Sequence, residues 1–147
     1  MADATGICNS ALAKIGAARI SALTRDLSEV FSIEDMHKLA NGSQHTIAYH
    51  PPCTLQHAQK LAGRVESLLI AAGFKLVPVK DSHLCCGSAG SYSILQPRIA
   101  NQLKLQKLHN LQEYEPALIV TANIGCQLHL QSEAAVPVKH WIELFAS

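Results

Sequence analysis

The first forty residues of the chain carry apolar side chains at the period of an α-helix. One stripe, at positions i, i+4, i+7 and i+8, is formed by Leu23, Leu27, Val30 and Phe31. Ser32, with Asp35 three residues later, has the pattern of a new helix start, and Asn41-Gly42 has the pattern of a helix end. We therefore predict an N-terminal helical lead-in of two helices.

From residue 46 onward, short apolar runs alternate with longer stretches at the helical period. The apolar runs predict strands at 46–49, 74–79, 117–121 and 136–138. The helical stretches predict helices from Leu61 to just before Gly73, at 97–111, at 125–130, and from Trp141 onward. Strands that alternate with helices in this way indicate βαβ units. The predicted fold class is therefore α/β, with a mostly parallel sheet flanked by helices.

Charge and hydropathy exclude several classes of partner. Lys and Arg number 12 against 11 Asp and Glu, so no strong field favours nucleic acid. The longest apolar runs, such as 117–122, are far shorter than the roughly 20 residues of a transmembrane helix. Residues 1–10 lack the basic and apolar regions of a secretory signal. We therefore expect a cytoplasmic protein, in which five cysteines favour metal or redox chemistry over disulfides.

Four cysteines share one position, in the loop or first helical turn after a predicted strand. They are Cys53, Cys85, Cys86 and Cys126. Carboxyl ends of parallel strands meet at one ligand-binding edge, so we expect these side chains to converge there. Two thiolates about 4 Å apart repel by roughly 4 kcal/mol at an effective dielectric constant of about 20, so a metal or protons must accompany them. Ligation by sulfur alone selects iron-sulfur clusters or zinc. Cys8 is expected to be an ordinary buried cysteine.

The adjacent pair Cys85-Cys86 is the sharpest feature of the set. Neighbouring α-carbons lie about 3.8 Å apart, whereas an ordinary disulfide needs roughly 4.4 to 6.8 Å, so a shared metal centre is a better use of the pair. Gly87 and Gly90 follow in the run Cys-Cys-Gly-Ser-Ala-Gly. We predict that they let the backbone approach a cofactor closely and supply N–H donors to its sulfurs.

The cysteine spacing resembles that of the cysteine-rich CCG domain, which occurs in heterodisulfide reductases and in related iron-sulfur proteins. In this chain 31 residues separate Cys53 from Cys85, and 39 separate Cys86 from Cys126. Within that family, four phrases are most similar to those of glycolate oxidase iron-sulfur subunits. The phrases are 49–57, 81–92, 120–130 and 140–143, and the resemblance covers almost all of residues 19–147.

The resemblance implies an electron-transfer subunit rather than a catalytic one. Its metal ligands would be the four cysteines, its cofactor an iron-sulfur cluster of the 4Fe-4S type, and its partners the flavin-containing subunits that oxidise glycolate to glyoxylate. Electrons would pass toward the quinone pool or another acceptor, with peripheral association at the inner face of the cytoplasmic membrane through the complex. Nothing in the sequence resembles a nucleophile with its base, so hydrolase chemistry has no support.

The chain departs from the family pattern in two respects. The last motif of the family is Cys-x-x-Cys, but here the fourth position is His129. The family also carries ferredoxin-like cysteine runs and a first CCG repeat ahead of this region, and only residues 4–8 resemble the tail of that repeat. We therefore expect a fragment of a longer subunit, with residues 1–42 as a helical segment from the preceding repeat and residues 43–147 as the CCG domain.

Two alternatives remain open from the sequence. The missing cysteine is compatible with a scaffold domain that holds zinc or no metal and docks other subunits. The spacing also fits the equivalent subunits of lactate-utilisation and heterodisulfide reductase systems. His129 is one candidate for the missing ligand, and His50, His57 and His83 are candidates for hydrogen bonds around the site, each equally compatible with an ordinary surface histidine.

Overall fold

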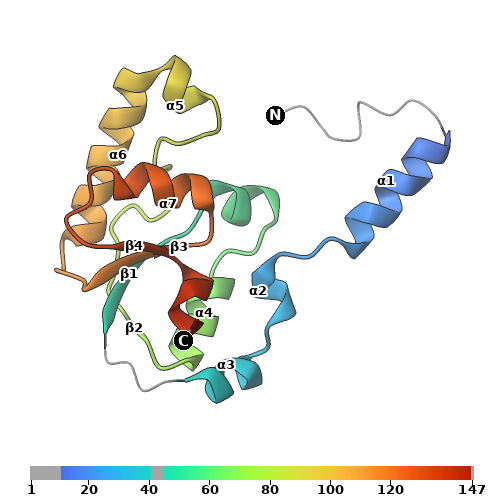
Figure 1. Ribbon diagram of the computed structural model, residues 1–147, viewed down its shortest axis with the longest axis horizontal. Helices are drawn as coiled ribbons and strands as arrows, with labels where there is room; N and C mark the ends of the chain where they lie inside the picture. Colours follow the sequence, from blue (N-terminus) through green and yellow to red (C-terminus); the bar gives the residue numbers. More distant parts are fainter. Residues whose placement is uncertain (1–10, 41–44, 147) are drawn as a thin grey trace. The chain divides into compact units, whose positions relative to one another are not determined.

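The computed structural model describes residues 11–40 and 45–146, with side chains from residue 16 onward. The chain divides into two compact units, residues 1–30 and 31–147. In the first unit, α1 (Ala11–Leu23) and α2 (Leu27–Val30) are separate helices (Figure 1). The single apolar stripe predicted from Leu23 to Phe31 is therefore wrong. The helix is interrupted because the Asp26 carboxylate accepts the backbone N–H of Ser28 at 2.9 Å, which starts a new helix at this point.

The second unit begins with α3 (Ile33–Leu39), which starts where the sequence predicts. The Ser32 hydroxyl accepts the backbone N–H of Asp35 at 3.1 Å, and the Asp35 carboxylate accepts the backbone N–H of Ser32 at 3.0 Å. This reciprocal pair is a capping box. The predicted helix end at Asn41-Gly42 lies outside the described residues.

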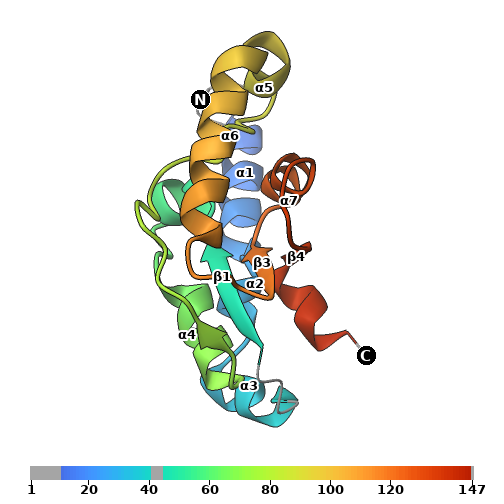
Figure 2. The same cartoon turned by 90° about the vertical axis from the view of Figure 1, so that its left-hand side faces the viewer.

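Four parallel strands form one sheet, which confirms the predicted α/β class. They are β1 (Thr46–His50), β2 (Lys75–Leu76), β3 (Leu118–Thr121) and β4 (Val138–His140), in the order β2-β1-β3-β4. The chain leaves β1 toward β2 on one side and then returns past β1 to add β3 and β4 on the other (Figures 1 and 2). The point where the strand order reverses therefore lies between β1 and β3, and ligands of such sheets bind at the carboxyl ends of the strands there.

Alternating side chains of the central strands face two separate cores. Ile47, Tyr49 and Val120 pack with α3, α4 (Arg64–Ala71) and the 3₁₀ helix η2 (Trp141–Phe145). Ala48 and Ile119, register partners in β1 and β3, pack on the opposite face with α6 (Pro97–Gln112) and α7 (Ile124–Gln131). Figures 1 and 2 show these two groups of helices on opposite sides of the sheet. The cysteine side chains that reach the core belong to the α6 and α7 side.

Two prolines explain why two strands differ from the predicted ranges. The strand predicted at 74–79 is reduced to β2 because Pro78 has no N–H, although the Val77 N–H still donates to the Ile47 carbonyl at 3.0 Å. The strand predicted at 136–138 begins only at Val138, after Pro137, whose carbonyl accepts the Ile119 N–H at 2.9 Å. Within the described part of the chain, no helix has the length and apolar character needed to cross a bilayer.

Candidate metal centre

Cys53 is placed by the abrupt end of β1. Pro51 and Pro52 cannot continue the sheet, and the chain turns into the short π-helix η1 (Thr54–Ala58) directly after Cys53. The turn is held by Gln56, whose backbone N–H donates to the Pro52 carbonyl at 3.1 Å and whose side-chain amide donates to the Pro51 carbonyl at 2.9 Å. Cys53 therefore lies at the carboxyl edge of the sheet, half-buried.

The segment that leads to Cys85 and Cys86 is fastened to α6 by buried polar side chains. The Lys107 ammonium donates to the carbonyls of Asp81 and Ser82 at 3.0 and 2.9 Å. The Asn110 amide donates to the carbonyl of Lys80 at 3.1 Å. Three successive carbonyls are thus held by one face of one helix, and this attachment positions the cysteine pair a few residues later.

The loop after the pair is tightly curled. Gly87, Ala89 and Gly90 have φ values of +92°, +34° and +62°. A β-carbon on Gly87 would lie 2.4 Å from the Ala100 carbonyl oxygen, so the loop lies directly against α6 at this position. The Gly87 N–H donates to Cys85 Sγ at 3.3 Å, and the Ser88 N–H donates to Cys86. Backbone donors to sulfur of this kind stabilise thiolates and tune metal centres.

Cys126 stands in the first turn of α7, directly after β3. The side chain of the N-cap residue Asn123 accepts the Cys126 N–H at 3.1 Å. Cys126 is buried at this helix amino terminus, and it lines the cysteine cavity.

The structure brings the four predicted cysteines together. Cys53, Cys85, Cys86 and Cys126 line one cavity of about 350 Å³, with Gly90 also in its wall. Side-chain hydrogen bonds link Cys53 with Cys85, Cys85 with Cys86, and Cys86 with Cys126. All four are free of disulfides, and Cys8 lies outside the described residues.

Crowding makes the thiols of Cys53, Cys85 and Cys86 reluctant to ionise on their own. Burial and then the neighbouring Cys85 raise the pKa of Cys53. The hydrogen bond to Cys86, followed by burial, raises the pKa of Cys85, and the hydrogen bond to Cys126 raises the pKa of Cys86 to about 11. A bound cation would reverse this preference, because a coordinating thiol is deprotonated by its metal.

Two basic side chains lie beside the thiols without being exposed. Lys107 is fully buried, and its ammonium interacts favourably with Cys86, Asp81, Cys85 and Cys126, although burial lowers the pKa of Lys107 to about 8. His50, the last residue of β1, is 1% exposed, and a nitrogen of its ring lies within 4.8 Å of the sulfurs of Cys86 and Cys126. Burial, and secondarily the charge of Lys107, lowers the pKa of His50 to about 3, so its ring is neutral.

The donor set fits a thiophilic metal centre. Sulfur ligands reach the cavity from the connections that follow three successive strands. Backbone N–H groups are directed at two of these sulfurs, and a buried cation balances their charge. Such soft ligation is typical of iron-sulfur clusters and zinc. The residues present therefore agree with the chemistry of either group.

The other histidines named from the sequence lie elsewhere. His57 and His83 are exposed. His129 is half-buried on α7, where its ring hydrogen-bonds to the Ala100 backbone. Among the described residues, the compact group of ligand atoms comprises His50, Cys86 and Cys126, without His129.

Sequence reasoning missed the role of Lys107, although a signal was available. Lys104, Lys107, Leu108 and Leu111 stand at i, i+3, i+4 and i+7, so both lysines share the buried face of α6. A charged side chain on an apolar helix face indicates a buried partner. Here the partners are the carbonyls that precede the cysteine pair.

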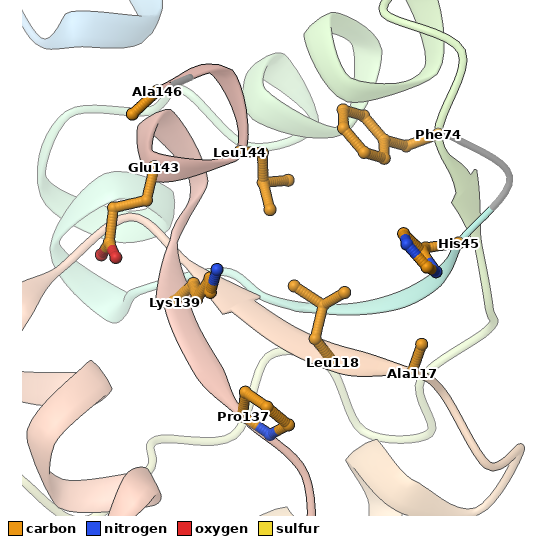
Figure 3. Close-up of a pocket in the computed structure, with 9 residues that line it drawn as sticks. All are labelled: His45, Phe74, Ala117, Leu118, Pro137, Lys139, Glu143, Leu144 and Ala146. Atoms are coloured by element: carbon orange, nitrogen blue, oxygen red, sulfur yellow. The ribbon is translucent and has the colours of Figure 1, made fainter. Parts of the chain in front are cut away.

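A larger cavity of about 450 Å³ lies at the opposite, amino-terminal edge of the sheet. Its walls include His45, Ala117 and Pro137, which precede β1, β3 and β4 (Figure 3). Its acidic group, Glu143, accepts the His140 N–H at 2.8 Å and the Gln127 side-chain amide at 3.0 Å, so that carboxylate serves a helix cap. The cysteine cavity is therefore the better candidate site despite its smaller volume.

Comparison with known proteins agrees with this geometry. The pattern of the CCG cysteine-rich domain matches residues 47–131, which contain all four cysteines of the cavity. The chain belongs to the CCG cysteine-rich domain family. The resemblance inferred from the spacing of the cysteines is thereby confirmed.

Several curated relatives match this chain over part of a longer protein. The chain is 50% identical over 136 residues to the glycolate oxidase iron-sulfur subunit of Escherichia coli, which covers 92% of this chain and 33% of that protein. It is 32% identical over 112 residues to a probable glycolate oxidase iron-sulfur subunit of Bacillus subtilis, with coverage of 73% and 25%. Lactate utilization protein A of Geobacillus kaustophilus is 30% identical over 127 residues, with coverage of 84% and 51%. The chain thus spans about half or less of the length of these relatives.

Substitution of Gly87 by Ala tests the contact between the cysteine loop and α6. A left-handed conformation costs a non-glycine residue about 1–2 kcal/mol, and Gly87→Ala adds a clash with the Ala100 carbonyl. Gly90→Ala is the matched control, since Gly90 also has a positive φ but its β-carbon would meet nothing within 4 Å. We expect Gly87→Ala to lower the free energy of unfolding of the metal-free protein clearly more than Gly90→Ala does. Equal losses in chemical denaturation would contradict the contact.

Substitution of Lys107 by Met tests how the cysteine loop is held. A hydrogen bond to a charged group contributes about 1.5–3 kcal/mol, so we expect amide hydrogen exchange in residues 80–86 to become roughly tenfold faster or more. Lys104→Met is the control, because Lys104 is also buried on α6 but donates to Ser132 at 2.8 Å instead. If both variants changed exchange in this loop alike, the assigned role of Lys107 would be wrong.

Proposed function

We propose that the chain holds an iron-sulfur centre through Cys53, Cys85, Cys86 and Cys126. The observation that carries the proposal is the shared cavity: thiols spread over 74 positions of the sequence reach it from the connections that follow β1, β2 and β3. Gly90 lies in the wall of this cavity, and Gly87, next to Cys86, packs against α6 and donates its N–H to Cys85 Sγ. Iron-sulfur chemistry would supply one-electron transfer at this position.

The rest of the proposal concerns the system in which the centre works. We propose an electron-transfer subunit of a glycolate-oxidising complex, in which flavin-containing subunits oxidise glycolate and this chain passes the electrons on. The support is the 50% identity to the E. coli protein against 30% for the lactate utilization protein. The centre would be of the 4Fe-4S type, and the compartment the reducing cytoplasm, with any membrane association made through the complex.

The residues of the chain provide what a relay site needs. Cys86 and Cys126 are buried, so bulk water is kept from the inner side of the centre. Lys107 lies beside them with its ammonium locked onto two carbonyls, so the positive charge stays in place when the charge of the centre changes. A fixed nearby cation favours the more negative, reduced state of such a centre.

A zinc-holding scaffold is the second candidate, and one observation favours it. The ligand atoms of His50, Cys86 and Cys126 lie within 4.8 Å of one another, which is compact enough for a single ion. Under this alternative the domain would dock other subunits without electron transfer.

Metal analysis of the anaerobically purified chain distinguishes the two. We expect iron and acid-labile sulfide in the wild type and loss of most of both in Cys85→Ser, because a ligand is removed. Cys8→Ser serves as the control, since Cys8 lies outside the matched residues 47–131. Unchanged metal in Cys85→Ser would remove that residue from the site, and a colourless wild type with stoichiometric zinc would favour the scaffold.

Substrate-driven reduction tests the wider system. The chain is combined anaerobically with the flavin-containing subunits of its own organism, and bleaching of its visible absorption is followed after addition of glycolate or lactate. We expect bleaching with glycolate. Bleaching with lactate alone would assign the chain to lactate utilisation, and the absence of bleaching with a loaded centre would contradict electron transfer from these subunits.

A further inference from the structure

His50 presents a buried imidazole with no hydrogen-bonding partner. The residue is 1% exposed, and both ring nitrogens, Nδ1 and Nε2, lack a partner. A buried polar group without a partner typically costs 1–3 kcal/mol, and native structures contain few of them. Each such group calls for an explanation, and a missing ion is one of them.

The position of His50 indicates where such an ion would bind. Side chains alternate along β1, and Ala48, two residues earlier, belongs to the core that also contains Cys86 and Cys126. The His50 ring therefore faces the cysteines, and one of its nitrogens lies within 4.8 Å of the sulfurs of both. In a tetrahedral site the ligand atoms are separated by about 3.8 Å, given metal distances of about 2.3 Å to sulfur and 2.0–2.1 Å to nitrogen. A closure of about one ångström would complete such a site.

We propose that His50 is a metal ligand of this centre, binding through one imidazole nitrogen beside Cys86 and Cys126. The inference rests on the proposed function, because it assumes that the cysteine cavity holds a metal. It assigns to a residue at the end of β1 the ligand position that the sequence leaves open at His129 on α7.

The surroundings of His50 favour ligation over a charged imidazolium. The ring is buried beside Cys86 and Cys126, and a neutral imidazole offers a lone pair to a metal without adding charge. His129 also has a buried ring nitrogen, Nε2, without a hydrogen-bond partner, but its ring bonds to the Ala100 backbone and stands outside the compact ligand group. Of the two histidines, His50 has the buried and unpartnered nitrogens at the sulfurs.

A second buried polar group without a hydrogen-bond partner lies next to His50. Thr121 is its register partner in β3, is fully buried, and has a hydroxyl without a hydrogen-bond partner. Ligand histidines almost always donate their second ring N–H to an oxygen, which fixes the orientation of the ring. The Thr121 hydroxyl, on the same face of the neighbouring strand, is suited to that role.

Ligation by His50 would change the reduction potential of the centre. A neutral imidazole in place of a thiolate raises the reduction potential of iron-sulfur centres. We therefore expect His50→Cys, which returns a thiolate to the position, to shift the potential downward relative to the wild type.

The test uses nitrogen couplings in pulsed electron paramagnetic resonance of the full chain. The wild type is measured with its reduced iron centre and, separately, with Co²⁺ loaded into the metal-free protein. Labelling with ¹⁵N-histidine identifies a directly bound imidazole without any substitution. We expect a strong histidine nitrogen coupling that is lost in His50→Ala and retained in His129→Ala, with Co²⁺ affinity reduced by more than about tenfold only in the former.

The outcomes separate this inference from the proposed function. A histidine coupling with Co²⁺ but no iron in the purified protein would uphold the His50 ligand and overturn the iron-sulfur proposal. A metal-loaded wild type without histidine coupling would overturn the ligand, and so would a coupling that survives in His50→Ala. If His50→Ala fails to fold, His50→Gln, which retains polar atoms at the position, takes its place in the same comparison.

Discussion

The crowding of four thiols against the interior of the sheet is the constraint on which this molecule depends. Cys86 and Cys126 are buried, Cys85 adjoins them, and hydrogen bonds between the sulfurs hold protons that isolated thiols would release more readily. Charged sulfurs at such separations repel strongly in a medium of low polarity. Two fixed positive groups offset this repulsion, namely the buried ammonium of Lys107 and the amino terminus of α7. These elements reduce the repulsion, and a metal would remove it.

The strand order explains why residues so distant in sequence can meet. β1 and β3 are neighbours at the point where the order reverses, so the loops that follow them open toward each other. Pro52 ends the ladder at β1, and Asn123 starts α7 directly after β3, so each cysteine stands at the edge rather than farther along a loop. The pair at 85–86 arrives on a longer connection and needs the anchorage by Lys107 and Asn110. Position is thus provided by backbone topology for two thiols and by side-chain anchors for the others.

Local pattern predicted the features that depend on few neighbours. The capping box at Ser32, the helix from Pro97 and the central strands follow from spacing within a few residues. The convergence of the cysteines followed from a general property of parallel sheets, and Cys53 and Cys126 lie at the ends of β1 and β3 as that property requires. Helical spacing places Lys107 on the apolar face of α6, but the partners of Lys107 and of His50 depend on tertiary packing that the sequence pattern does not reveal. A lysine on a helix face is solvated or buried according to tertiary contacts that composition does not encode.

The proposed ligand at His50 follows from the same electrostatic constraint. A site with several thiolates and one buried ammonium already carries excess negative charge, and a further thiolate would increase it in a medium that screens poorly. A neutral imidazole adds a donor atom without adding charge. The end of β1 can supply one with only a small closure of the site, since the strand alternation already directs His50 toward the sulfurs. His129, at the position where the resemblance implies a last cysteine, and the buried His50 are therefore compatible parts of one charge balance. With His50 as a ligand, the set would keep its number of donors while its net charge became less negative.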